Sequence, residues 1–384
     1  MPIPEHYKGR EQSYVKHLLL EAYLEKLFMI LGRYQSTICY VDCFAGPWEE
    51  GTDDLSDTSI AISLRIMKKC REGLKKTFNR DVTFRAFFIE IKPTSFQKLE
   101  KYLKENQFDG ISAEARQGDF LQLRDAILKW CGNQFSFFFV DPTGWEEIQI
   151  AHLAPLLKRP NSEYLITFMY EFLVRFCEKD DLADKMIGMF GATPDVSGMT
   201  PQEKEHHLLS LYRENAQKHA GATSYVGRVD VLDPCIDRTK YHLVYITRHP
   251  LGLIKFMEAS ESVEGVQREV RAQAKQDRRV ERTGQPELFN AEQAPPADWK
   301  AAAKDYSAID GAKTYWLKQL RKEPAAFDEA ALARMLHETG WFISDIQAAF
   351  ADLLSEGKVK NLDAKRTRPK NPVNFKNGEK LCLS

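Results

Sequence analysis

The sequence lacks the short-range patterns that mark several large protein classes. Its seven cysteines include no Cys-x-x-Cys pair and no spacing of a zinc finger or a disulfide framework. Free thiols in a reducing compartment are the simplest interpretation, and no metal site is expected. No stretch reaches about 18 uninterrupted apolar residues, and the amino terminus has no apolar signal core. We therefore expect a soluble, cytoplasmic protein without a membrane partner.

The chain also lacks a strong net charge. Its formal net charge is −1 at pH 7 over 384 residues, of which 43% are hydrophobic and 28% charged. A net charge this small gives no long-range electrostatic attraction to nucleic acid or membrane. The length is sufficient for a full hydrophobic core and for two domains. The charge is uneven, however, because residues 357–384 carry eight Lys or Arg against Asp363 and Glu379. A neutral body thus carries a basic tail.

Apolar strand patterns alternate with helical patterns over roughly the first 260 residues, which is typical of a doubly wound α/β domain. The segment 135–140 is nearly all aromatic, as expected of a central parallel strand buried on both faces. The predicted strands are 37–42, 82–91, 113–118, 135–140, 164–170, 225–231 and 241–248. The predicted helices are 11–34, 58–74, 94–105, 121–131, 148–157, 181–190 and 201–220. The expected fold is a Rossmann-like sheet with helices on both faces.

A carboxylate stands at or just beyond the end of each of the first four strands. These residues are Asp42, Glu90, Asp119 and Asp141. Because the carboxyl ends of parallel strands share one edge, where ligands bind, the four acids predict a ligand site there. Each acid taken alone has a structural alternative as a strand-end residue, a helix cap or an Asp-Pro turn.

The turn after the first strand indicates which cofactor fits. The run Cys43-Phe-Ala-Gly-Pro-Trp48 has no Gly-x-Gly-x-x-Gly, and Pro47 and Trp48 stand where a dinucleotide's phosphates need free amides. A nicotinamide-dependent oxidoreductase is therefore the weakest functional hypothesis, because only the predicted sheet topology supports it. A nucleoside cofactor without phosphate fits better, and S-adenosylmethionine is the commonest.

The proposed cofactor contacts divide by chemistry. Glu90 is placed to accept from the ribose diol, and Asp119 to meet the adenine amino group. Asp42 can orient the turn or reach the methionine ammonium. The remaining expected contacts are Phe44, Ala45 and Gly46 in the turn and Phe120 as a stacking neighbour.

The segment Asp141-Pro-Thr-Gly-Trp145 would face the methyl group. Asp141 and the carbonyl of Pro142 can accept both hydrogens of an exocyclic amine and aim its lone pair, which is catalysis by positioning. Trp145 can stack on a planar acceptor. Lys16, on the first predicted helix, can close over the cofactor, although we expect a solvated lysine.

The carboxyl-terminal part has a different pattern. Residues 264–296 read as a solvated charged helix and a linker, followed by helical patterns at 309–321, 329–338 and 344–356, the last with Ser344 as N-cap. Two strands, 357–363 and 379–384, would complete a winged helix-turn-helix. The expected domains are 1–263, 264–304 and 305–384. The proposed phosphate contacts are Lys358, Lys360, Arg366 and Arg368, although such a wing can equally dock a protein.

Together the segments 41–47, 88–90 and 139–145, with Asp119 and His249-Pro-Leu-Gly-Leu-Ile-Lys-Phe-Met257, resemble the bacterial three-Cys-motif partner proteins. The resemblance implies an S-adenosylmethionine-dependent methyltransferase-like domain followed by a winged helix-turn-helix. It also implies a separately encoded, radical-SAM-like partner that carries three cysteines, so this chain's own cysteines need not bind metal.

Two hypotheses from different classes follow. The first is a methyltransferase that modifies an amino nitrogen on DNA, RNA or another macromolecule held by the winged helix; a base in a duplex would have to be flipped outward. The second is a non-catalytic partner that binds a nucleoside and docks protein or DNA.

Overall fold

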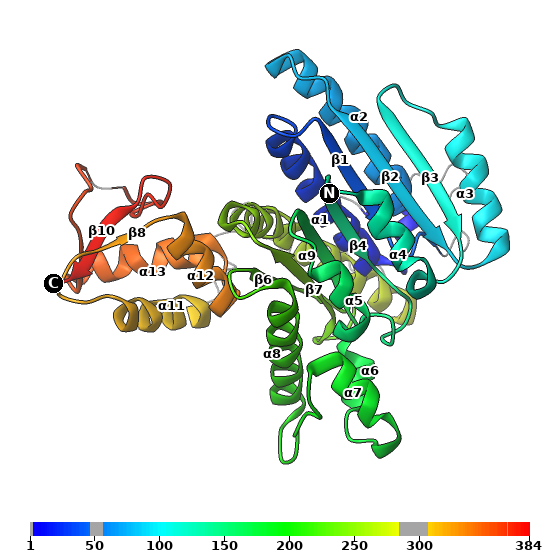
Figure 1. Cartoon of the computed structure of the whole chain (residues 1–384). Helices are drawn as coiled ribbons and strands as arrows, with labels where there is room; N and C mark the ends of the chain where they lie inside the picture. Colours follow the sequence, from blue (N-terminus) through cyan, green and yellow to red (C-terminus); the bar gives the residue numbers. More distant parts are fainter. Residues whose placement is uncertain (1–2, 47–56, 284–305, 367) are drawn as a thin grey trace. The chain divides into compact units, whose positions relative to one another are not determined.

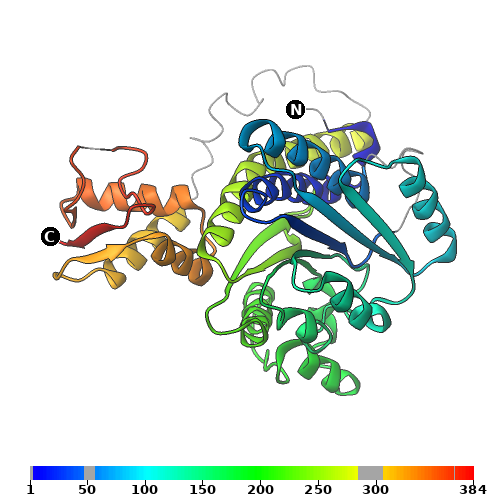
Figure 2. The same cartoon turned by 45° about the horizontal axis from the view of Figure 1, so that its top comes forward.

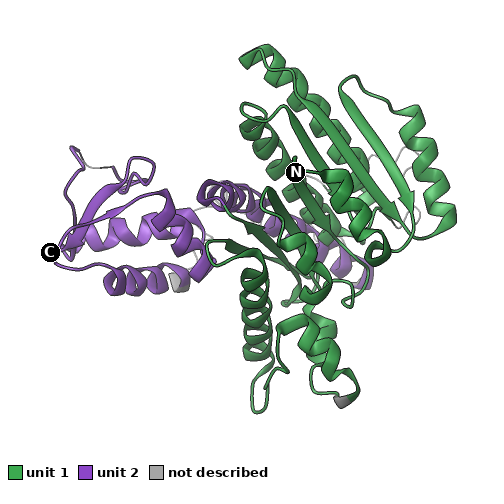
Figure 3. Cartoon of the chain, in the orientation of Figure 1, with its two compact units in different colours: residues 1–248 green, residues 249–384 purple. Residues whose placement is uncertain are grey.

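The computed structural model describes residues 3–46, 57–283, 306–366 and 368–384 (Figure 1). The chain forms two compact units, residues 1–248 and residues 249–384 (Figure 3). Pro47 and Trp48, on which the argument against a dinucleotide depends, lie outside the described residues. Within the described ranges, no helix is both long and apolar enough to cross a membrane.

The first unit is built on a seven-stranded sheet in the order β3-β2-β1-β4-β5-β7-β6. The neighbours from β3 to β5 pair in parallel, and β7 pairs antiparallel with both β5 and β6. This is the Rossmann-like arrangement expected for a class I methyltransferase sheet. The strands are β1 (Thr37–Asp42), β2 (Thr83–Glu90), β3 (Ile111–Gln117), β4 (Phe135–Val140), β5 (Ser162–Phe168), β6 (Tyr225–Leu232) and β7 (Thr239–Thr247).

Helices cover both faces of this sheet. Figure 2 shows α1 and α2 on one face and α5 to α8 on the other. Local sequence explains several starts: Thr58 caps α2, and Thr200 and Glu203 form a reciprocal capping box around Pro201 at the start of α8. The helices are α1 (Glu11–Leu31), α2 (Ser59–Phe78), α3 (Pro93–Glu105), α4 (Phe120–Cys131), α5 (Ile150–Leu157), α6 (Tyr170–Phe176), α7 (Ala183–Phe190) and α8 (Pro201–Ala220), with short 3-10 turns at Glu5–Tyr7 and Asp180–Leu182.

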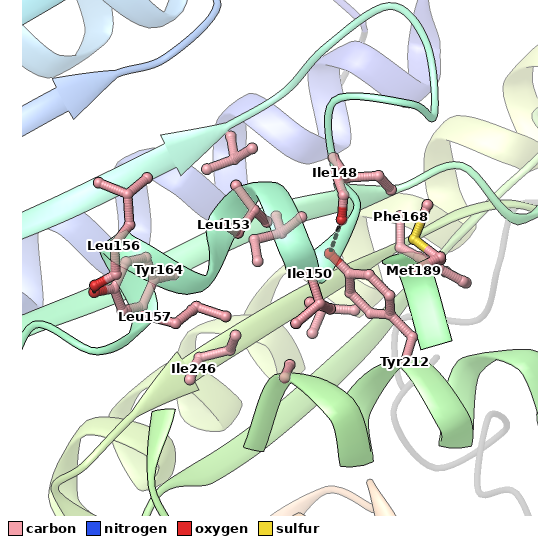
Figure 4. Packing of buried hydrophobic residues seen from close by; sticks show 14 of the residues in the cluster. Ile148, Ile150, Leu153, Leu156, Leu157, Tyr164, Phe168, Met189, Tyr212 and Ile246 are labelled. Carbon is pink, nitrogen blue, oxygen red and sulfur yellow. Dashed lines mark hydrogen bonds between the residues drawn. The ribbon is translucent and has the colours of Figure 1, made fainter. Parts of the chain in front are cut away.

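The core on the α5 and α8 side is a continuous apolar cluster (Figure 4). Tyr212 of α8 is fully buried, and its hydroxyl donates to the backbone oxygen of Ile148, at 2.9 Å. The aromatic strand β4 lies at the centre, with Phe137, Phe138 and Phe139 all buried. The prediction that this strand is central and buried on both faces is confirmed.

The second unit begins with the long helix α9 (Pro250–Thr283), which packs against α12. Its other elements are α11 (Tyr306–Gln319), β8 (Ala325–Phe327), α12 (Glu329–Thr339), α13 (Ile343–Ser355), β9 (Val359–Asn361) and β10 (Glu379–Leu383). The three strands form an antiparallel sheet in the order β8-β10-β9. Trp316 is fully buried within this unit, and the Nε1 of its indole donates to the backbone oxygen of Ile346, at 3.0 Å.

Two sequence predictions about this unit were wrong, and one element was missed. Ser344 is not an N-cap, because α13 begins at Ile343 and the carboxylate of Asp345 accepts from the N–H of Phe342 at 3.3 Å. The charged segment after residue 264 is not a wholly solvated helix, because α9 buries Gln267, Val270 and Ala274 at helical spacing. The short strand β8 was not predicted.

Candidate functional site

Asp42 and Asp141 lie on either side of the point where the strand order reverses. From β1 the chain continues to β2 and β3 in one direction, whereas β4 and β5 extend in the other. Asp42 ends β1 opposite Phe139 of β4, and Asp141 follows β4 directly. Ligands of open α/β sheets bind in the crevice at such a switch point, beyond the carboxyl ends of the strands.

The carboxylates of β1, β2 and β4 lie on one face of the sheet. One pleat before them, Tyr40 stacks on Phe137, with ring centroids 6.1 Å apart, and lies 6.1 Å from the ring of Phe88. Because side chains alternate between faces, residues two positions after a strand residue share its face. Asp42, which follows Tyr40, and Glu90, which follows Phe88, therefore project toward the side of α1 and α2, as does Asp141.

Asp42 is fully buried and held by two donors. Its Oδ1 accepts from the N–H of Phe44 at 3.2 Å, and its Oδ2 accepts from the hydroxyl of Ser59 at 2.6 Å. Burial raises the pKa of Asp42 to about 7, a change that these two hydrogen bonds oppose. The neighbouring charge of Asp141 raises the pKa further, and Lys16 lowers it. Near neutral pH this carboxyl is poised between its two protonation states.

Lys16 is the candidate site residue whose surroundings were predicted wrongly from the sequence. We expected it to be solvated, but it is only 8% exposed and its ammonium forms a salt bridge with Oδ2 of Asp141. The same ammonium lies 5.6 Å from the ring centroid of Tyr241. Lys16 therefore lies on the side of α1 that faces the sheet and not solvent. No local motif signals it, because 125 residues separate Lys16 from its partner.

Backbone hydrogen bonds join both the turn after β1 and the residue after β3 to the end of β2. The N–H of Ala45 donates to the oxygen of Ile89 at 2.7 Å, and the N–H of Gly118 donates to the oxygen of Glu90 at 3.1 Å. Glu90 is 5% exposed, and its Oε1 accepts from the N–H of Lys92 at 2.6 Å. The turn, which also contains Phe44 and Gly46, thus lies directly beside the Glu90 strand end.

Asp119 serves as the N-cap of α4. Its Oδ1 accepts from the N–H groups of Leu121 and Gln122, at 2.8 and 3.3 Å. Phe120 is buried, and its ring centroid lies 5.2 Å from that of Phe44. Asp119 therefore has a capping role of its own at the predicted edge, and Phe120 belongs to the core.

The segment after β4 turns its aromatic residue inward. Pro142 is buried directly after Asp141. Trp145 is 7% exposed, and its ring stacks on Phe176 of α6 at a centroid distance of 6.1 Å. The ammonium of Lys185 lies 5.8 Å from the same ring. Trp145 is therefore packed within the core. The sequence did not show this packing, because α6 was not predicted.

A second group beside Lys16 was not identified from the sequence. The hydroxyl of Tyr7 lies 2.9 Å from Nδ1 of His17 and donates to the backbone oxygen of Asp57, at 3.2 Å. Asp57 also accepts from Arg10 at 2.8 Å. Burial lowers the pKa of His17 to about 3, so this imidazole stays neutral. The only sequence signal was a run rich in Tyr, His and Lys ahead of the first helix.

The chain's cysteines do not resemble a ligand set. Burial raises the pKa of Cys39 to about 11 and that of Cys70 to about 12, so both stay protonated thiols. Across the described part of the chain, no group of three or more His, Cys, Asp or Glu side chains is arranged to hold a metal ion.

The four proposed phosphate contacts of the second unit have unequal surroundings. Lys360 and Arg366 are exposed, and Lys358 is exposed but paired with Glu356 at 2.8 Å. Arg368 is half-buried and donates to both carboxylate oxygens of Glu379, each at 2.6 Å. Arg368 therefore has a structural partner within its own unit.

No family model and no curated protein matches the chain. Among solved structures, a Legionella pneumophila DUF519 protein is 13% identical, covering 65% of this chain and 90% of its own, with a TM-score of 0.37. An SAH-bound Podospora anserina methyltransferase is 10% identical over 64% and 97%, with a TM-score of 0.28. A loganic acid methyltransferase with SAH is 9% identical over 73% and 92%, with a TM-score of 0.27. At these scores the argument for a site rests on the strand order and the side chains described above.

Proposed function

We propose that the chain is an S-adenosylmethionine-dependent methyltransferase that acts on an amino nitrogen. The observation that carries this proposal is the pair of carboxylates, Asp42 and Asp141, on one face of the sheet at its switch point, where Lys16 of α1 forms a salt bridge with Asp141. When bound, S-adenosylmethionine supplies an electrophilic methyl group.

Asp42 and Glu90 suit the two ends of this cofactor. A buried carboxyl whose pKa is about 7 gains a favourable partner when an ammonium approaches, because the positive charge replaces lost hydration. Asp42 would therefore hold the methionine ammonium in its ionised form. Glu90, nearly buried beside the turn at Ala45, would accept from the ribose diol.

Asp141 would orient the acceptor. Lys16 binds Oδ2 of Asp141, which leaves Oδ1 to accept a hydrogen bond from the acceptor amine. Together with the carbonyl of Pro142, it would aim the nitrogen lone pair at the methyl group. The N–C bond would form as the S–C bond breaks and S-adenosylhomocysteine leaves, and the Asp141 carboxylate would take the proton that the methylated nitrogen gives up. Asp119 and Phe120 would lie beside the adenine of the cofactor. Trp145 would hold the segment after β4 in place through its packing on Phe176.

The acceptor is proposed to be part of a nucleic acid, which the basic carboxyl-terminal part of the chain would hold. The helices α11, α12 and α13 with the β8-β10-β9 sheet support assigning this part as a winged helix domain within residues 305–384. On the resemblance to three-Cys-motif partner proteins, we further propose that a separately encoded radical-SAM-like protein is the chain's partner.

The deciding experiment uses purified protein and radiolabelled S-adenosylmethionine. Calorimetry measures cofactor binding, and label is then followed into separate pools of DNA, tRNA and total protein, with and without the proposed partner. Label in a nucleic-acid pool that disappears in Asp141→Asn supports the proposal. Cofactor binding with no transfer to any pool would instead support a non-catalytic nucleoside-binding partner, and absence of cofactor binding would overturn both.

A further inference from the structure

We infer that residues 358–366 and 368–380, here named the basic loop, bind a nucleic-acid backbone without reading its sequence, and that α13 does not act as a recognition helix. The inference rests on the proposed function only for the identity of the methylated molecule. Its physical basis lies wholly within the second unit.

The basic loop presents cations that have no acidic partner of their own. The salt bridges of this segment use Lys358, paired with Glu356, and Arg368, paired with Glu379. Six further cations are exposed and form no salt bridge to any described residue: Lys360, Lys365, Arg366, Lys370, Lys376 and Lys380. Four of these cations lie on the connection between β9 and β10, and Lys360 and Lys380 lie on the two strands themselves. Such an excess of positive charge is complementary to a chain of phosphates.

The loop is held in shape by a buried acid. Glu379 is 7% exposed and accepts from Arg368, from Nδ2 of Asn361 at 2.7 Å and from the N–H of Asn374 at 2.7 Å. Burial opposes ionisation, but these donors together lower the pKa of Glu379, so the carboxylate stays charged. The loop's charge is therefore displayed on a fixed scaffold.

Gln347 of α13 fastens the other side of the loop. Its Nε2 donates to the oxygen of Val373 at 2.8 Å, and its Oε1 accepts from the N–H of Val373 at 3.1 Å. Gln347 is 4% exposed, so both bonds are shielded from water. A loop ordered before binding loses little conformational entropy when it meets its ligand.

The helix α13 has the opposite character. From Ile343 to Glu356 the chain carries no Lys or Arg, and its charged residues are Asp345, Asp352 and Glu356. Asp352 and Glu356 pair with Lys313, at 2.9 and 3.4 Å. A recognition helix must approach phosphates closely to reach base edges in the major groove. Because α13 carries no cation of its own, it offers phosphates no charged partner, and we assign the contact to the basic loop.

Backbone binding without base contacts predicts affinity that depends on salt and not on sequence. The test measures fluorescence anisotropy of the full chain on labelled 20-base-pair duplexes of two unrelated sequences, as DNA and as RNA, over a salt series. We expect the two sequences to bind within about threefold of each other. The triple variant K365Q/R366Q/K370Q should reduce the slope of log K against log salt by about 2 to 3.

Two controls separate the loop from the helix. Lys318→Gln removes an exposed cation of α11, outside the loop, and should leave the slope unchanged. The double variant S344A/S355A trims the exposed hydroxyls of α13 and should leave both affinity and sequence tolerance unchanged. A sequence preference above about tenfold that disappears in S344A/S355A would overturn the inference. So would an unchanged slope in the triple variant, or displacement of the duplex by polyglutamate at equal charge concentration.

Cofactor binding and methyl transfer are measured on the same variants. If the full chain binds duplexes as described but transfers no methyl group, the proposed function fails and this inference stands. If methyl transfer to nucleic acid persists while the triple variant binds duplexes like the unaltered chain, this inference alone fails.

Discussion

Lys16 and Asp141, 125 residues apart in the chain, form a salt bridge at the switch point of the sheet. Their side chains are 10% and 18% exposed, so water compensates either charge poorly if its partner is removed. Breaking a buried pair by deleting one partner typically costs about 3 to 5 kcal/mol, whereas neutralising both costs much less. Substituting either residue alone should therefore lower the free energy of unfolding as well as change the charge at the proposed site.

The substitution Asp141→Asn should abolish methyl transfer while cofactor affinity stays within a few fold, because its proposed partner is the acceptor amine. Radiolabel transfer and calorimetry measure the two quantities. If both fall together in a folded variant, Asp141 is a cofactor ligand or a purely structural acid.

The variant Lys16→Met should lower kcat, because it removes the ammonium that holds Oδ2 of Asp141 in place. Lys16→Arg, which keeps the charge, should restore much of the rate. An unchanged kcat in Lys16→Met, despite a lower melting temperature, would limit Lys16 to a structural role.

The substitution Glu90→Gln should weaken S-adenosylmethionine binding by on the order of 2 kcal/mol, since a charge-assisted acceptor for the ribose diol is lost. Glutamine can still accept from Lys92, so the local turn is retained. The control is Glu105→Gln, at an exposed position on α3. Equal affinities of the two variants by calorimetry would remove Glu90 from the site.

Cofactor affinity should rise with pH through about 7. Because burial raises the pKa of Asp42 to about 7, the free protein is largely protonated there at pH 6, and an ammonium ligand must displace that proton. Calorimetry in buffers of different ionisation enthalpy should detect proton release below pH 7 and little above it. Asp42→Asn should bind more weakly and without this pH dependence, and proton release that survives in this variant would assign it to another group.

The same group should affect unfolding. The folded-state pKa of Asp42 lies above its usual value of 3.8, so its contribution to stability is greatest below about pH 4, decreases as pH rises to about 7 and is constant above. At pH 8, Asp42→Asn should therefore be more stable than the unaltered chain, by up to roughly 4 kcal/mol. Urea unfolding at pH 4 and pH 8 measures the difference, and equal effects at both would contradict it.

Trp316→Ala tests the independence of the two units. Truncating this fully buried indole should cost roughly 3 to 5 kcal/mol in the second unit and abolish nucleic-acid binding. The affinity for S-adenosylmethionine should remain within about twofold, because separate cores fold separately. Trp316→Phe, which loses the hydrogen bond to Ile346 but keeps an aromatic ring, should be milder. A parallel loss of cofactor binding would show that the units depend on each other.

The sheet was predictable because its signals are local. The runs of aromatic and β-branched residues in β1 and β4 specify buried strands, and strand 37–42 and helix 201–220 have the predicted bounds. Strand β8 was missed because three residues, Ala-Ala-Phe, carry almost no pattern. Its pairing with β10 is a tertiary property.

The acids of the site could be located, but their partners could not. Strand ends identify Asp42, Glu90 and Asp141 from sequence alone, since parallel strands place their carboxyl ends together. The burial of Lys16 depends on which face of α1 meets the sheet, and that of Trp145 on an unpredicted helix. Similarly, the charged sequence of α9 concealed its buried side, because polar residues such as Gln267 can be buried when their hydrogen bonds are satisfied.

The position of β7 has a consequence for biosynthesis. It is the last strand of the large sheet in the chain, yet it is inserted between β5 and β6. Until residue 247 has left the ribosome, the long β5 edge has no hydrogen-bonding neighbour on that side. A nascent chain or proteolytic fragment that ends earlier would expose this edge, and it would be prone to aggregate with other copies.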